Sequence, residues 1–165
     1  MASPAQLVEL VSAVTGVPPR TISDIDRKLA IAKLRTKTGR GFSVAQMSPL
    51  DAARLLTGLL ASAQSKDAAE AVLRYARTQT DLARSSAGLF GAAGLKDLAE
   101  LPPGHGFVDA LAAVVASASS GDLAKIIASG SPPKIEVFAF VRATRGRIRI
   151  AGLPNGLTEI GRAHV

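Results

Sequence analysis

The sequence contains no cysteine and no tryptophan, a single tyrosine and only two histidines. Without cysteine there are no disulfide bridges, no thiol catalysis and no metal site with thiolate ligands. Two histidines leave little material for imidazole-based metal binding or acid–base catalysis. Aromatic residues make up 4% of the 165 residues, so smaller side chains have to form the core.

Alanine is abundant instead, with 30 residues, and 47% of the chain is hydrophobic against 20% charged. This composition can bury a core and favours close-packed helices. The N-terminal residues lack the basic stretch and apolar run of a secretory signal, and no apolar run is long enough to cross a bilayer. We therefore expect a cytoplasmic protein with no membrane partner.

Positive charge is concentrated in two parts of the chain. Residues 1–50 hold 7 basic and 3 acidic side chains, residues 51–133 hold 7 and 8, and residues 134–165 hold 6 and 2. The net charges are +4, −1 and +4, which give +7 in total. Such a distribution favours a polyanionic partner such as nucleic acid, although a net charge of this size also serves solubility alone.

Helical periodicity covers most of the chain up to residue 129. Ser3 with Pro4, and Ser48 with Pro49, are pairs typical of a helix start, and Gly16 predicts a helix end. Helices are expected over residues 4–14 and 20–34, from Ser48, from Ser65, and over 107–117 and 122–129, with short helices joined by loops between residues 85 and 106. In the first, the apolar residues at helical spacing are Leu7, Leu10, Val11 and Val14. In the third, the buried side is expected to be Leu55, Leu56, Leu59 and Leu60.

After residue 133 the hydrophobic period changes from 3.6 to 2, which predicts two strands, residues 135–142 and 147–150, with a turn near Thr144–Gly146. The first strand is apolar on both faces, with Phe138 and Phe140 opposite Ile135 and Val137. The predicted fold class is mainly α, with an N-terminal winged helix-turn-helix at 1–47, a helical bundle at 48–130 and a small C-terminal β-hairpin at 134–152.

Residues 7–51 follow the order of a winged helix-turn-helix: an apolar helix, a short turn, a helix with a polar N-terminal half and a basic, glycine-containing hairpin. Side chains at the start of the second helix would reach base edges, whereas those one turn later and in the hairpin would contact phosphates. The predicted DNA-binding residues are Arg20, Thr21, Ser23 and Asp24, then Arg27 and Lys28, then Arg35, Lys37 and Arg40.

The run from Lys37 to Leu56 resembles a stretch in small proteins of alphaproteobacterial prophages and mobile elements, with the pattern G-R-G-x-x-A-x-x-M-(S/T)-P-x-D-A-A-x-L-L. The resemblance covers about residues 5–62 and includes a preceding helix-turn-helix-like segment. This chain departs from the pattern by conservative changes between Val44 and Gln46, and it lacks the family's glycine between Leu29 and Leu34. The resemblance implies a DNA-binding protein of phage or mobile-element origin.

The predicted function is therefore sequence-dependent binding of double-stranded DNA by a transcriptional regulator. A homodimer is compatible with this function. The alternative is a non-catalytic helical module for protein–protein interaction or structure. No catalytic residue, cofactor or metal site is predicted, so the chain is not expected to be an enzyme. His105 lies in a Pro-Gly-rich loop, and no glycine-rich run matches a phosphate-binding loop.

The predicted hairpin carries a second basic set, Arg142, Arg145, Arg147 and Arg149. By the period of two, Arg147 and Arg149 share one face. The set is interpreted either as a ribbon that contacts nucleic acid or as charges that protect a sheet edge from aggregation, and the second interpretation is preferred.

The last residues, Glu159–Val165, resemble the translation of a widely used sequencing adapter. We predict that they are an artefact of sequence assembly, that the native chain continues past about Thr158, and that these residues contribute little to stability.

Overall fold

The computed structural model describes residues 2–36, 46–80, 94–128 and 133–151, and the backbone of 160–164. Within these residues the protein is mainly helical with a small antiparallel sheet, as predicted. The chain divides into two compact units, residues 1–73 and 74–165, which are described separately.

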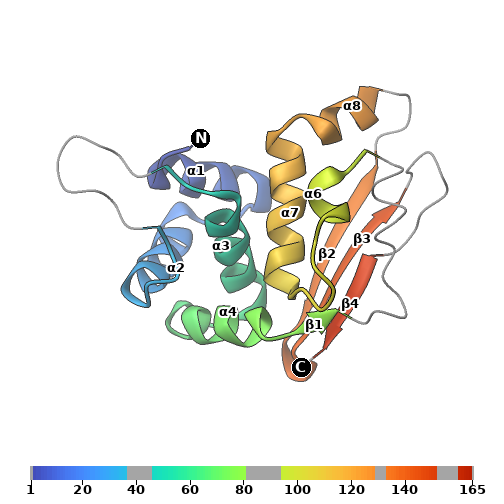
Figure 1. The fold of residues 1–165 in the computed structure, drawn as a ribbon. Coiled ribbons are helices and arrows are strands. Elements are labelled where there is room, and N and C mark those ends of the chain that lie inside the picture. The colour runs from blue at the N-terminus through green and yellow to red at the C-terminus, as the bar shows by residue number, and fades with distance from the viewer. Residues whose placement is uncertain (1, 37–45, 81–93, 129–132, 152–159, 165) are drawn as a thin grey trace. The chain divides into compact units, whose positions relative to one another are not determined.

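The N-terminal unit consists of α1 (Pro4–Thr15), α2 (Pro19–Ile31), α3 (Pro49–Ala61), the short 3₁₀ helix η1 (Ser65–Asp67) and the first part of α4 (Ala68–Ala76) (Figure 1). Ser3 and Gln6 cap α1 reciprocally, and Gly16 ends it at φ 71°. Ser48 and Asp51 form the same kind of capping box on α3. The predicted helix starts and the Gly16 stop are confirmed because they depend on local chemistry.

Helix α2 ends three residues earlier than predicted. The chain leaves the helix after Ile31, and Lys33 adopts a left-handed φ of 58°. The backbone N–H of Leu34 then donates to the carbonyl of Leu29 at 2.9 Å. The turn is thus a normal helix stop in which a lysine occupies the position that favours glycine.

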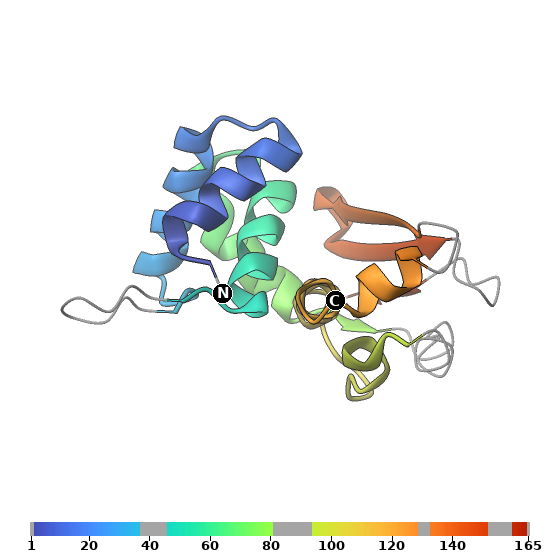
Figure 2. The same ribbon diagram turned by 90° about the horizontal axis from the view of Figure 1, so that it is seen from above.

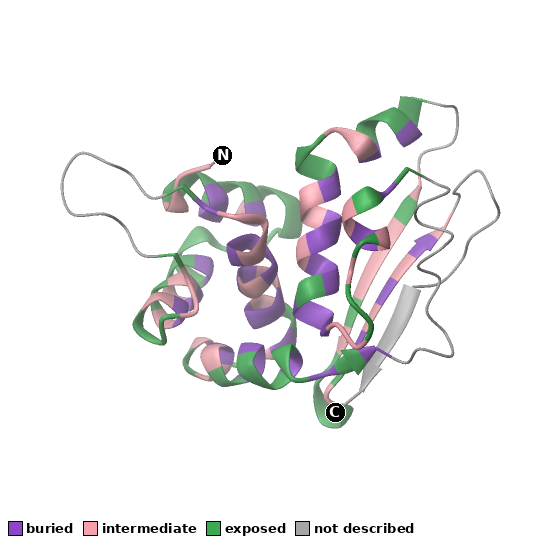
Figure 3. Ribbon diagram, viewed as in Figure 1, coloured by how far each residue is buried: buried purple, intermediate pink, exposed green. Residues whose placement is uncertain are grey.

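The buried sides of α1 and α3 differ from the expected leucine stripes. Leu10 is 59% exposed and Val14 78% exposed, and Leu60 is 43% exposed. In α3 the neighbours of Leu55 in the core are mostly small: a Cβ on Gly58 would lie 3.2 Å from Cγ2 of Ile25. Small residues allow α2 to approach α3 closely, and they occupy most of the buried positions that are purple along α3 in Figure 3. The buried residues of α3 are Asp51, Ala52, Ala53, Leu55, Thr57, Gly58 and Ala61.

The C-terminal unit combines helices with a four-stranded antiparallel sheet of order β1-β4-β3-β2. Helices α6 and α7 lie on one side of the β2–β3 hairpin (Figure 2). The helices are α6 (Lys96–Ala99), α7 (Phe107–Ser119) and α8 (Asp122–Ala128). The strands are β1 (Gln79–Thr80), β2 (Lys134–Phe140), β3 (Arg145–Ala151) and β4 (Ile160–His164), and the 3₁₀ turn η3 (Val141–Ala143) joins β2 to β3.

The inner face of the sheet packs on α7. Ile148 and Ile150 are each 1% exposed, and the ring of Phe107 lies so close to Gly146 that a Cβ there would collide with it. Tyr75 meets Phe107 edge to face, with ring centroids 5.5 Å apart. A glycine is required at this point of β3 because the aromatic ring occupies the space of a side chain.

The predicted hairpin is confirmed, but it belongs to a larger sheet. Residues 160–164, for which little contribution to stability is predicted, form β4, which pairs with β3 on one side and with β1 on the other. In particular, Ala163 pairs with both Gly146 and Thr80. The adapter origin of these residues stays a prediction. The predicted wing lies mostly at 37–45, outside the described residues.

Within the described ranges, no single helix is long and apolar enough to span a membrane. Helices α7 and α8 reach that length and hydrophobicity only when taken together, and the chain bends by 65° between them.

Candidate nucleic-acid interface

Helix α2 has one wholly buried face and one polar face. Ile22, Ile25 and Leu29 are 0%, 3% and 1% exposed, so they fix the rotation of the helix on the N-terminal unit. On the other face the side chains of Arg20, Thr21, Ser23 and Arg27 are exposed, and those of Asp24 and Lys28 are partly exposed. The six α2 residues predicted from the sequence therefore lie outside the core, on one helix.

The charges on this face are only weakly engaged. Arg27 pairs with Asp24 at 3.2 Å, with side chains that are 68% and 45% exposed. An ion pair this exposed contributes little stability, so a phosphate can compete for the guanidinium. Within the part of the chain that the structure describes, no side chain pairs with Arg20. On the polar face, Arg20 has no such side-chain partner, and Arg27 can exchange its ion pair with Asp24 for one with a phosphate.

Arg35 lies differently from the prediction. Its Nη1 is 3.3 Å from Oδ2 of Asp26, and the two side chains are only 14% and 15% exposed. Burial raises the pKa of Asp26. The positive charge of Arg35 lowers this pKa, and the negative charge of Asp51 raises it further. The guanidinium is thus used inside the N-terminal unit, and Arg35 is removed from the candidate DNA contacts because tertiary packing gives it a partner on α2.

The segment predicted as the wing starts and ends at one carboxylate. Thr36 donates to Asp51 through its backbone N–H (Oδ1) and its hydroxyl (Oδ2), each at 2.8 Å. Ser48 donates to Oδ2 through its backbone N–H at 2.8 Å and its hydroxyl at 2.7 Å. These three residues, here called the Asp51 cluster, hold residues 36 and 48 together at the N-terminus of α3.

The Asp51 cluster keeps its carboxylate ionised. Burial would raise the pKa of Asp51, but the hydrogen bonds from Ser48 and Thr36 outweigh it and lower the pKa below 3.8. The positive end of α3 adds to the same preference for negative charge. Sequence reasoning did not find the contact of Thr36 with Asp51, because the two residues are 15 positions apart.

Two further contacts fix the approach to this segment. Nη1 of Arg54 donates to the carbonyl of Leu34 at 2.9 Å. The backbone N–H of Met47 donates to the carbonyl of Ala2 at 2.9 Å, and the Met47 side chain is 5% exposed. The remaining predicted contacts, Lys37 and Arg40, lie outside the described residues.

In the ranges that the structure describes, no three histidine, aspartate or glutamate side chains gather in a way that could hold a metal ion. His105 lies in a loop, where its Nδ1 is 3.0 Å from the carbonyl of Pro102 and its own carbonyl accepts from Thr80. Its contacts are those of a structural loop residue.

Comparisons of the chain with models of protein families, with curated proteins and with solved structures give no match. The functional argument therefore depends on the geometry of the chain itself.

Proposed function

We propose that the protein binds double-stranded DNA through its N-terminal unit and acts as a transcriptional regulator of phage or mobile-element origin. The observation that carries the proposal is the polar outer face of α2. Its N-terminal half presents Arg20, Thr21 and Ser23 to solvent while the opposite face is fully buried. A helix held in this way can enter the major groove as a rigid body.

The connection between α1 and α2 is consistent with this role. Three residues, Gly16, Val17 and Pro18, join the helices, and Gly16 takes the left-handed conformation. A short turn containing glycine is typical of helix-turn-helix units. The first helix would then cross the DNA backbone while the second enters the groove.

The chemistry of the α2 face matches both parts of a duplex. An arginine at the helix start can donate two hydrogen bonds to guanine, and serine or threonine can contact either strand's bases. Arg27 and Lys28 follow one turn later, where a helix in the groove passes close to phosphates. The segment held by the Asp51 cluster carries Lys37 and Arg40, which would add phosphate contacts beside the groove.

The test begins with selection of a preferred duplex from a randomised library by the full chain. Binding of that duplex is then compared for the protein, for Arg20→Ala and for Lys96→Ala by fluorescence anisotropy. If Arg20 contacts a guanine, Arg20→Ala costs about 1–3 kcal/mol and relaxes the preference at one base position. Lys96 is an exposed cation on α6, so Lys96→Ala controls for loss of charge. Equal affinities in all three proteins contradict the assignment of α2.

One observation favours the alternative, protein–protein interaction. Leu10 and Val14 lie one turn apart on α1 and are 59% and 78% exposed. Residues spaced in this way form a continuous apolar strip that a second helix can cover. The candidate partner is a second copy of the chain, and Leu10→Ser with Val14→Ser is expected to abolish any dimer seen by light scattering.

A further inference from the structure

The outer face of the β2–β3 hairpin, which points away from α7, combines aromatic and cationic side chains. In the register of the two strands Phe138 lies opposite Arg147 and Phe140 lies opposite Arg145. Directly paired residues of antiparallel strands project from the same face, so these four side chains share one surface. Residues 134–151 contain five basic residues and one acidic residue, a net charge of +4.

The two phenylalanines on this face are exposed. Phe138 is 41% exposed and Phe140 47% exposed, and their rings are stacked with centroids 6.3 Å apart and an interplanar angle of 24°. The inner face of the same hairpin buries Ile148 and Ile150 almost completely. The exposed rings are therefore not part of the core of this unit, and together they form an aromatic pair on its surface, here called the platform.

Edge protection does not explain the arginines. The strand order β1-β4-β3-β2 places β3 between two strands, and among the described strands β2 is the one at the edge. Arg145, Arg147 and Arg149 all lie on β3. Charges that prevent edge-to-edge aggregation belong on the edge strand. The position of these arginines therefore does not support their interpretation as charges that protect a sheet edge.

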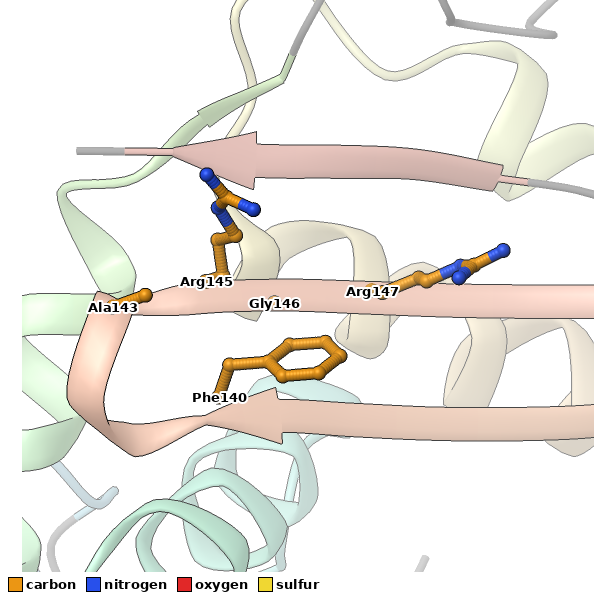
Figure 4. Close-up of a pocket in the computed structure, with 5 residues that line it drawn as sticks. All are labelled: Phe140, Ala143, Arg145, Gly146 and Arg147. Atoms are coloured by element: carbon orange, nitrogen blue, oxygen red, sulfur yellow. The ribbon is translucent and has the colours of Figure 1, made fainter.

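Two hollows adjoin the platform. One, of about 200 Å³, is lined by Phe140, Ala143, Arg145, Gly146 and Arg147 (Figure 4). The other, of about 310 Å³, lies at the turn and is lined by Arg74, Arg77 and Arg142 with Ala143 and Thr144. The one acidic side chain of the hairpin, Glu136, lies toward the other end, where it pairs with Lys134 at 2.7 Å and Arg149 at 3.5 Å. Positive charge is thus concentrated at the end of the hairpin where Phe140 lies.

We propose that this outer face binds single-stranded DNA, with two bases stacked on Phe138 and Phe140 and the backbone phosphates following the arginines around the turn. Aromatic platforms beside a cationic groove are the general means by which proteins bind unpaired strands. A duplex cannot use the platform, because its bases are already stacked and paired. The site lies in the C-terminal unit, so it is separate from the α2 surface and does not depend on the proposed duplex binding.

The chemistry of the face provides little that would select RNA over DNA. Recognition of RNA uses hydrogen bonds to the ribose 2′-hydroxyl. Between residues 134 and 151 there is no asparagine, glutamine or serine, and Thr144 in the turn is the only hydroxyl. The face therefore offers stacking and charge, which every single strand can use, and almost nothing that would select a ribose.

The experiment uses the full chain and a fluorescein-labelled oligo-dT of about 15 nucleotides, within the usual size range of such sites. Phe138→Leu and Phe140→Leu keep an apolar side chain on the strand but remove the ring. Each is expected to weaken oligo-dT binding on the order of 10-fold. Ile127→Ala, at a residue of α8 that is 50% exposed, is the matched control and leaves affinity unchanged. Arg145→Gln and Arg147→Gln should each flatten the salt slope by about 0.7.

A spectroscopic variant tests stacking directly. The chain has no tryptophan, so Phe140→Trp introduces a single indole whose emission is expected to be quenched by a stacked base. Arg20→Ala should leave oligo-dT binding intact, which distinguishes this site from the α2 surface. The proposal is overturned if the chain does not bind oligo-dT, if both leucine variants bind it as tightly as the protein does, or if the indole emission is unchanged on binding. A strong preference for oligo-rU overturns the assignment to DNA.

Discussion

Thr36 donates two hydrogen bonds to the carboxylate of Asp51, one from its backbone N–H and one from its hydroxyl, each at 2.8 Å. Because Ser48 donates to the same carboxylate, one buried side chain closes the base of the segment from residue 37 to 47. The carboxylate also caps α3, so helix start and loop base are a single structural feature.

Removal of the Asp51 carboxylate should therefore destabilise the N-terminal unit. Asp51→Ala leaves the buried donors of Thr36 and Ser48 without an acceptor and removes the cap, at a cost of about 2–3 kcal/mol. Urea unfolding followed by circular dichroism measures this cost. Asp67→Ala, at a less buried carboxylate in the first turn of η1, should change stability by less than about 0.5 kcal/mol. Equal effects of the two variants would contradict the role of the Asp51 cluster.

The same carboxylate predicts a pH dependence. The pKa of Asp51 is below 3.8 in the folded protein, so the unfolded chain takes up the proton first as pH falls. The stabilisation is fully present well above the ordinary carboxyl pKa and is lost as pH falls through the folded pKa. The difference in unfolding free energy between the protein and Asp51→Asn should therefore be constant near neutral pH and shrink in acid, as the carboxyl group is protonated. A difference that grows on acidification would contradict the assigned direction.

For the ion pair between Arg35 and Asp26 we expect the opposite dependence of stability on pH. Arg35→Met leaves a largely buried carboxylate without its cation, which should cost up to about 3 kcal/mol at neutral pH. Because burial already raises the pKa of Asp26, and Arg35 opposes that rise, this variant should recover stability as pH falls and Asp26 takes up a proton. Adding Asp26→Asn should restore most of the loss at neutral pH. A double variant no more stable than Arg35→Met alone would show that charge is not the cause.

Local chemistry was predictable from the sequence, and long-range pairing was not. The caps at Ser3 and Ser48 and the stop at Gly16 are set by neighbouring residues. Arg35 pairs with Asp26 because the chain after α2 folds back against that helix, and the periodicity of the sequence does not predict this contact. The pairing of β4 with β1 joins segments about 80 residues apart, and β1 has only two residues, too few for a recognisable alternation.

The turn of the hairpin contains a strained residue. Thr144 has φ 41°, a left-handed conformation that a β-branched side chain disfavours. Thr144→Gly should therefore raise the unfolding free energy by about 1 kcal/mol, even though glycine adds entropy to the unfolded chain. Ala143, the neighbouring residue in η3, has no positive φ that glycine would relieve. Ala143→Gly should therefore lower the unfolding free energy. Thermal unfolding of both variants tests the turn, and a loss of stability in Thr144→Gly would contradict its geometry.

Deletion of residues 159–165 tests the place of β4. Without β4, the strand β3 loses its pairing partner on one side and β1 loses its only partner among the described strands. We expect a loss of about 1–2 kcal/mol, seen as a melting temperature lower by several degrees, together with self-association through the newly exposed edge. A truncated chain with unchanged melting temperature and mass would show that β4 contributes nothing to the fold.

The most direct test of the proposed duplex binding is the salt dependence of binding by the full chain. The logarithm of the association constant for a duplex should fall linearly with the logarithm of salt concentration, with a slope of about −0.9 per phosphate contacted. Arg27→Ala should flatten that slope by about one unit while Lys96→Ala leaves it unchanged. Binding that is absent at low salt, or a slope that Arg27→Ala does not alter, would contradict the assignment of α2 to DNA.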